Sequence, residues 1–204
     1  DQTNKFVTRY LQSTHCDLFF ADAAILVEGV AESMLLPHFI RSKFPELYQR
    51  YITILGVNGR HAHRLSPLIE KLCLPTLVIT DLDPAEKEGY HKSVVPKRGE
   101  GQISGNYAIA KWLMKEKDID KLVDYSEDKK EFSFASPYRF SIRLAYQTPV
   151  KVDFEGEEKE AIPGTFEDCL IYTNYDLFKK IKVTDSGNLV EQTHDLLNSN
   201  DTFE

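Results

Sequence analysis

The sequence predicts an α/β fold in which a parallel sheet is flanked by helices. Short apolar runs alternate with segments of helical spacing, a pattern typical of βαβ units. The 204 residues are 42% hydrophobic, which is enough for one sizeable core with a smaller appendage. Three widely separated cysteines argue against a disulfide framework and fit a reducing cytoplasm. No apolar run approaches the roughly 18 residues that a membrane span needs.

The first half of the chain supplies the alternating elements. Compact apolar runs, two of them closing on a glycine, predict the strands. Apolar residues at helical spacing predict the helices, one of them despite Pro37, and Ser104 or Asn106 is a suitable N-cap for the last. We expect strands at residues 23–29, 51–59 and 75–83, and helices at residues 31–44, 63–74 and 104–116.

The pattern changes after residue 115, where charged and short apolar stretches follow one another. Residues 132–136 and 150–154 are typical of short strands, residues 155–164 of a charged loop, and residues 165–181 of a helix. The core is therefore expected at about residues 20–115 and 163–204. An added α/β or helical subdomain is expected at about residues 116–162.

Carboxylates follow two of the predicted strands. Glu28 ends the first strand, Asp81 ends the third, and Asp83 lies two residues later, on the same side of an extended backbone. If the two strands are neighbours, the three anions meet at the carboxyl edge of the sheet and repel one another. A hard cation such as Mg²⁺ or Mn²⁺ relieves that repulsion. The alternative is that Asp81 and Asp83 belong to a solvated loop.

Glu32 lies four residues after Glu28, at the start of the following helix. One helical turn brings it back towards the same edge of the sheet. Its alternative interpretation is an ordinary first-turn glutamate that benefits from the helix dipole.

These motifs resemble those of a known family. "LVEG" at Glu28 and "ITDLD" at Asp81 and Asp83 are similar to the marks of the Toprim domain. Together with "ITILGVNG", "SGNYAIAKWL" and "GTFEDCLIYTN", they resemble the C-terminal nuclease region of the OLD (overcoming lysogenization defect) family. The resemblance covers residues 14–175 and implies a Toprim, Rossmann-like sheet.

The resemblance implies a DNA endonuclease that works with two Mg²⁺ or Mn²⁺ ions and acts in phage defence. By position in the family's motifs, Glu28, Asp81 and Asp83 are catalytic and bind one ion. Glu32 and Glu167 hold the other, supported by the hydroxyl of Thr165. The alternative for Thr165 is a plain N-cap of the helix that follows it.

The family also implies partners outside this sequence. Its N-terminal half is an ABC-type ATPase, and no G-x-x-x-x-G-K-[ST] phosphate loop occurs here. Because the sequence does not begin with methionine, we expect a piece of a longer protein in which ATP acts only through that absent domain. The intact protein is expected to be a homodimer that acts on DNA, with no membrane association.

A lysine that the family carries further downstream is expected to lie beyond Glu204. Lys179, Lys180 and Lys182 are nearer, but their spacing favours a solvated helix face. The identity of a catalytic lysine therefore stays open.

The net charge of −7 argues against a passive DNA-binding protein, which would be basic, so the candidates for DNA contacts are local basic residues. Arg60 and Arg64 flank the His61–His63 pair in "GRHAHR", and Lys97 and Arg98 follow the Asp-x-Asp motif. We expect the two pairs of basic residues to contact the DNA backbone. Zinc binding by the histidines and ordinary solvent exposure are the alternatives. Residues 135–147 interleave arginines with aromatic residues, which suits single-stranded DNA but also an amphipathic strand or helix.

Two other functions compete with the nuclease. A haloacid-dehalogenase-type phosphatase also carries Asp-x-Asp after a strand, with the first aspartate as nucleophile. In that class the motif follows the first strand, whereas here "LVEG" precedes it. The second alternative is a Toprim module without activity that only assembles a complex.

Overall fold

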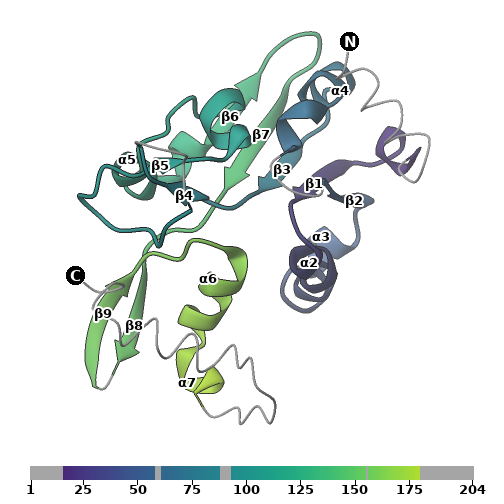
Figure 1. Ribbon diagram of the computed structural model, residues 1–204. Coiled ribbons are helices and arrows are strands. Elements are labelled where there is room, and N and C mark those ends of the chain that lie inside the picture. Colours follow the sequence, from purple (N-terminus) through teal and green to yellow (C-terminus); the bar gives the residue numbers. More distant parts are fainter. Residues whose placement is uncertain (1–15, 58–60, 88–92, 155, 180–204) are drawn as a thin grey trace. The chain divides into compact units, whose positions relative to one another are not determined.

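A computed structural model describes residues 16–57, 61–87, 93–154 and 156–179 (Figure 1). These residues divide into two compact units, which are considered separately below. Within the described ranges, the first unit takes residues 16–80, 106–116 and 125–145. The second unit takes residues 81–105, 117–124 and 146–179.

A five-stranded sheet forms the centre of the first unit, in the order β2-β1-β3-β7-β6. Its strands are β1 (Ala23–Val27), β2 (Ile52–Gly56), β3 (Thr76–Ile79), β6 (Glu131–Phe134) and β7 (Phe140–Ala145). All neighbouring strands are parallel except β6 and β7, which form an antiparallel pair. The prediction of a mostly parallel α/β sheet is therefore confirmed. Two of its strands, β6 and β7, come from the segment that follows residue 115.

The central strand β1 is buried along nearly its whole length. Ala24 to Val27 are all buried, as the continuous apolar run predicts for a strand covered on both faces. On one face, Ile25 and Val27 pack with Ile40 of helix α2. The helices of this unit are α2 (Val30–Lys43), α3 (Pro45–Tyr48) and α4 (Ser66–Leu72), with short turns η1 (Cys16–Phe19), η2 (Ala62–Leu65), η3 (Ala108–Trp112) and η4 (Glu127–Lys130).

The helix predicted at residues 104–116 is much shorter in the structure. Only Ala108–Trp112 is helical, and this turn has π-helical hydrogen bonding. Within the part of the chain that the structure describes, no helix is long and apolar enough to cross a membrane.

Glu127 connects η4 to β7 in the first unit and also pairs with a buried lysine. Lys130 is 1% exposed, and its Nζ lies 2.8 Å from Glu127 Oε1. Arg143 Nη2 of β7 lies 2.7 Å from the other carboxylate oxygen of Glu127. Hydrogen bonds from Lys130 and then Arg143 hold the pKa of the Glu127 carboxyl below its ordinary value.

The second unit is built around a hairpin and two short helices. Strands β8 (Val150–Phe154) and β9 (Glu157–Ala161) pair antiparallel, and their apolar residues pack on α6 (Phe166–Thr173) and α7 (Tyr175–Phe178). The unit also contains β4 (Pro84–Ala85), β5 (Ile103–Ser104) and α5 (Ile119–Val123).

Two expectations for this segment are corrected. Residues 157–161, expected in a charged loop, form β9, because Gly156 turns the chain at φ +84° and the backbone then pairs with β8. The helix expected at residues 165–181 is divided at Asn174 into α6 and α7.

Candidate functional site

Glu28 directly follows β1, at the carboxyl edge of the parallel sheet. Strands β1 and β3 are neighbours in parallel register, with Leu26 beside Val78. Two residues further on, the Thr80 hydroxyl donates a hydrogen bond to Glu28 Oε1. The expectation that the first and third strands lie side by side is therefore confirmed, and it places Glu28 beside the end of β3.

A second donor to Glu28 comes from Asn106. Asn106 is fully buried, and its Nδ2 donates to Glu28 Oε1 at 2.7 Å. Its Oδ1 accepts the backbone N–H of Ala108 at 2.9 Å. Asn106 therefore bonds to the first residue of η3, but the N-cap of that turn is Tyr107 and not Ser104 or Asn106 as predicted. The same contact orients the Asn106 amide so that its NH₂ faces the glutamate.

Glu32 occupies an unusual position in the first turn of α2. It is 3% exposed, and no donor among the described residues lies within hydrogen-bond distance of its buried Oε2. The oxygen lies close to the backbone of Gly29, where an added Cβ would be 2.5 Å from it. Gly29 has an extended backbone (φ −115°, ψ 176°), so the close approach of the carboxylate is what requires glycine here.

A buried carboxylate oxygen without a donor is costly unless a cation or a proton compensates it. The position of Glu32 therefore fits a divalent ion better than it fits an ordinary first-turn glutamate, which would be solvated.

Asp81 begins the second unit and is held by two donors. Gln147 Nε2 donates to Asp81 Oδ1 at 2.6 Å, and the backbone N–H of Phe166 donates to the same oxygen at 3.0 Å. Gln147 also accepts the N–H of Leu82 at 2.8 Å through its Oε1. Because Gln147 is 7% exposed and bonded at both ends of its amide, it fixes the orientation of the Asp81 carboxylate.

The first turn of α6 brings further predicted residues to Asp81. Thr165 is the N-cap: its hydroxyl accepts the N–H of Asp168 at 3.2 Å, and the Asp168 carboxylate accepts the N–H of Thr165 at 3.1 Å. Glu167 is exposed and follows Phe166, the residue whose N–H binds Asp81. The N-cap interpretation of Thr165 is thus observed, while its role towards a metal ion stays a prediction.

Asp83 differs from the sequence-based expectation. Strand β3 ends at Ile79, and Asp83 has a left-handed backbone with φ +48°, which aspartate tolerates better than most residues. The argument that Asp81 and Asp83 point the same way along an extended strand is therefore wrong. Gly105 N–H donates to the Asp83 carbonyl at 2.8 Å, which ties this turn to the segment after β5.

The predicted metal ligands are distributed over both units. Glu28 and Glu32 belong to the first, whereas Asp81, Asp83 and Glu167 belong to the second. Among the residues that the structure describes, no group of three or more His, Cys, Asp or Glu side chains is already gathered as a metal site. The metal roles of these residues are accordingly taken up as a proposal below.

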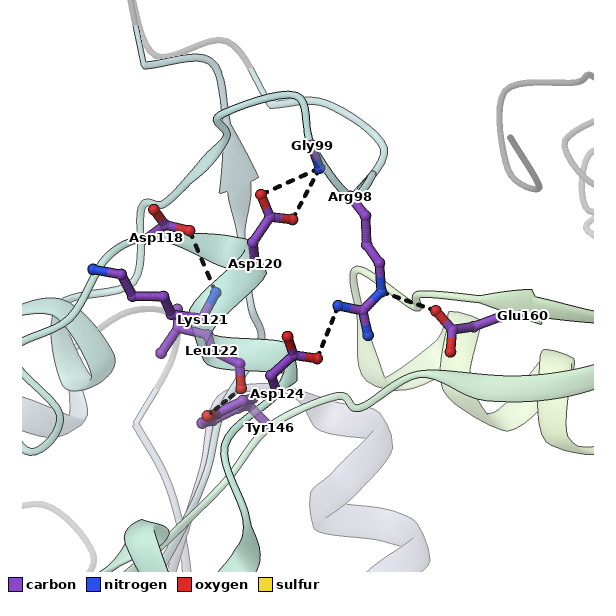
Figure 2. Close-up of polar contacts among 9 residues, drawn as sticks. All are labelled: Arg98, Gly99, Asp118, Asp120, Lys121, Leu122, Asp124, Tyr146 and Glu160. Atoms are coloured by element: carbon purple, nitrogen blue, oxygen red, sulfur yellow. Dashed lines mark hydrogen bonds and ion pairs between the residues drawn. The ribbon is translucent and has the colours of Figure 1, made fainter.

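Arg98, predicted to contact DNA, is engaged by carboxylates of its own unit (Figure 2). Its Nη1 lies 2.8 Å from Asp124 Oδ1, and its Nε lies 2.9 Å from Glu160 Oε1. Hydrogen bonds with Glu160 and then Asp124 raise the pKa of the guanidinium above its ordinary value. The next residue is also fixed, since Gly99 N–H donates to both oxygens of Asp120 at 3.0 and 3.2 Å. Arg98 thus links α5 to the β8–β9 hairpin.

The structure describes two of the three other basic residues that were predicted to contact DNA. Lys97 precedes Arg98, and its backbone N–H donates to Gln102 Oε1 at 2.9 Å. Arg64 lies in η2 and is partly buried, and Arg60 lies outside the described residues.

Sequence reasoning missed Thr80 and Gln147, which hold Glu28 and Asp81. Each is a polar residue directly after an apolar run, and that is the signal that marks them in the sequence.

Comparisons with known proteins agree with the α/β fold. A family model for the overcoming lysogenization defect protein-like TOPRIM domain matches residues 19–83, which include β1, β2 and β3 and end at Asp83. The chain is also similar to endonuclease GajA of Bacillus cereus (strain HuB5-5), with 28% identity over 175 residues. This similarity covers 86% of the chain but only 23% of the length of the relative. No solved structure matches the chain at a comparable level. Residues 19–83 therefore match an OLD-like Toprim domain, and the chain is distantly similar to endonuclease GajA.

Proposed function

We propose that this chain is the catalytic region of a metal-dependent DNA endonuclease that hydrolyses phosphodiester bonds. Two findings support the proposal: the Toprim match, and the similarity to a protein whose name is endonuclease. The observation that carries it is the buried Glu32 Oε2, for which no described residue supplies a hydrogen-bond donor. A bound cation would compensate such an oxygen.

In this proposal the acidic residues of both units bind two Mg²⁺ or Mn²⁺ ions. The ligands are Glu28, Glu32, Asp81, Asp83 and Glu167, with the Thr165 hydroxyl as a supporting ligand. When bound, such ions activate water at neutral pH and neutralise charge on a phosphodiester. Carboxylate and hydroxyl oxygens are the donor atoms that these hard cations prefer.

The protein's own contribution is to fix the orientation of the ligands. Thr80 and Asn106 both donate to the same oxygen of Glu28, which restricts the rotation of its carboxylate. Gln147 and the Phe166 N–H do the same for Asp81. Neutral donors hold these carboxylates without cancelling their charge, so that the charge stays available for a cation.

The rest of the function belongs to the longer protein that the relative suggests. We propose that an ATPase domain of that protein controls the nuclease, that ATP acts through this domain, and that the intact protein is a homodimer. A role in phage defence is part of the same proposal.

Plasmid nicking by the 204-residue chain tests the nuclease. Glu32→Gln removes the charge of a buried first-turn glutamate at nearly constant size. Its matched control is Glu46→Gln, because Glu46 is an exposed first-turn glutamate of α3 in the same unit. Asp81→Asn is matched in the second unit by Asp176→Asn, an exposed first-turn position of α7.

The chain and both controls should nick supercoiled plasmid with Mg²⁺ or Mn²⁺, and EDTA should stop the reaction. Glu32→Gln and Asp81→Asn should be slower by at least about tenfold. Nicking that persists in EDTA, or full activity in both test variants, would contradict the proposal.

A further inference from the structure

A basic and aromatic cluster lies in the first unit beside the residue that binds Glu28. Lys111 Nζ lies 4.0 Å from the centre of the Tyr107 ring, a cation–π contact. The His63 ring meets Tyr107 edge to face, with ring centres 5.5 Å apart. Tyr107 is 42% exposed and Lys111 is exposed, so the cluster faces solvent.

The cluster is connected to Glu28 through one residue. Tyr107 directly follows Asn106, whose Nδ2 lies 2.7 Å from Glu28 Oε1. The two turns that carry the cluster, η2 with His63 and η3 with Lys111, pack against each other. Tyr107 and Glu28 are thus both neighbours of Asn106, Tyr107 along the chain and Glu28 through a hydrogen bond.

The net negative charge of the chain opposes DNA binding, and the cluster supplies local positive charge. A net charge of −7 repels DNA, so a phosphate backbone can approach an acidic site only where local cations offset it. Lys111 supplies such a cation.

Two other Tyr–Lys pairs with the same four-residue spacing show that the contact alone does not define a site. Lys129 Nζ lies 5.3 Å from the ring centre of Tyr125, and Lys179 Nζ lies 6.0 Å from that of Tyr175. The pair at Tyr107 is tighter. It also has a histidine at the tyrosine ring and is adjacent in sequence to a residue that binds Glu28.

We propose that Lys111 binds a backbone phosphate of the DNA strand that is presented to Glu28, and that Tyr107 and His63 position its ammonium group. This inference rests on the proposed nuclease function and adds a substrate contact to it. Lysine binds phosphate as a point charge on a flexible stem, so an aromatic ring that holds the ammonium group reduces the entropy lost on binding.

Duplex DNA binding in EDTA tests the inference without any cleavage. Fluorescence anisotropy of a labelled oligonucleotide at several salt concentrations gives the affinity and its salt dependence. Lys111→Gln should weaken binding roughly tenfold at low salt. It should also reduce the slope of log K against log salt by about 0.9, the value for one lost phosphate contact. The matched control Lys129→Gln should leave both quantities unchanged.

Two substitutions of Tyr107 test whether its ring positions the Lys111 ammonium group. Tyr107→Phe keeps the ring and should bind like the unaltered chain. Tyr107→Ala should lose affinity but keep most of the salt slope, because the Lys111 charge is still present. Circular dichroism confirms that each variant is folded.

Nicking and binding can fail independently. If Lys111→Gln keeps the full slope and affinity while Glu32→Gln loses nicking, the inference is wrong and the nuclease stands. If Lys111→Gln reduces the slope of log K against log salt by about 0.9 but the unaltered chain does not nick, the phosphate contact stands and the nuclease proposal is wrong. Failure of the unaltered chain to bind duplex DNA at low salt would also overturn the inference.

Discussion

Gln147 should stabilise the second unit by bridging Asp81 and the backbone next to it. Its side-chain amide donates to Asp81 Oδ1 at 2.6 Å and accepts from Leu82 N–H at 2.8 Å. Leu82 is fully buried, so its N–H loses its acceptor in a buried position when Gln147 is removed. Gln147→Ala breaks both contacts at once.

The expected loss of stability follows from these two contacts. A buried N–H left without an acceptor costs about 1–3 kcal/mol, and a hydrogen bond to a charged group contributes about 1.5–3 kcal/mol. Asp81 keeps its bond from Phe166 N–H and can regain some solvation, so the second contribution is only partly lost. We expect a destabilisation of about 2–4 kcal/mol.

Urea unfolding followed by far-UV circular dichroism measures this loss. Hydrogen exchange should show faster exchange of the Leu82 amide in the same variant. The exposed Gln49 at the end of α3 provides the control, and Gln49→Ala should change stability by less than about 0.5 kcal/mol.

Gln147→Glu refines the test. It keeps an acceptor for Leu82 but places a second carboxylate against Asp81, so its cost should shrink as the pH falls and one carboxyl becomes protonated. A Gln147→Ala variant with the stability of the unaltered chain, and with normal protection of the Leu82 amide, would refute the reasoning.

Other predictions concern the first unit and the cysteines. Glu127→Gln should destabilise the chain by about 1 kcal/mol at pH 7, a small value because the Glu127 side chain is 65% exposed. Because the folded-state pKa of Glu127 is lowered, this contribution is complete above the ordinary glutamate pKa. It disappears as the pH falls through the lowered value, which urea titrations at several pH values can follow. Burial raises the pKa of the Cys169 thiol, so iodoacetamide at pH 8 should label exposed Cys16 well before Cys169, as mass spectrometry can show. Gly29→Ala should push the Glu32 carboxylate out of place and weaken Mn²⁺ binding in a calorimetric titration while the helix content stays unchanged.

Strands β1, β2 and β3 of the sheet were predictable because they are local apolar runs, whereas β6 and β7 lie in the segment that was expected to form an added subdomain. Ala24 to Val27 are buried on both faces, and a central parallel strand needs that continuous run. The position of Glu28 followed from the same pattern, since the carboxyl edge of a parallel sheet begins where the apolar run ends.

The contacts that fix the acidic residues were not predictable from such patterns. Thr80 and Asn106 lie 52 and 78 positions from Glu28, and Gln147 lies 66 positions from Asp81. Hydrogen bonds over such separations are set by tertiary packing and leave no period in the sequence. Strand β9 was missed for a related reason: its charged side chains obscure a backbone that pairs with β8.

Anomalous diffraction from Mn²⁺-soaked crystals tests the central claim, that the acidic residues of this chain are metal ligands. The account predicts peaks at about 2.1–2.2 Å from carboxylate oxygens of Glu28, Glu32, Asp81, Asp83 and Glu167. Two ions in one centre should lie about 3.5–4 Å apart. Manganese bound only to other residues, or no peak at saturating Mn²⁺, would contradict the claim.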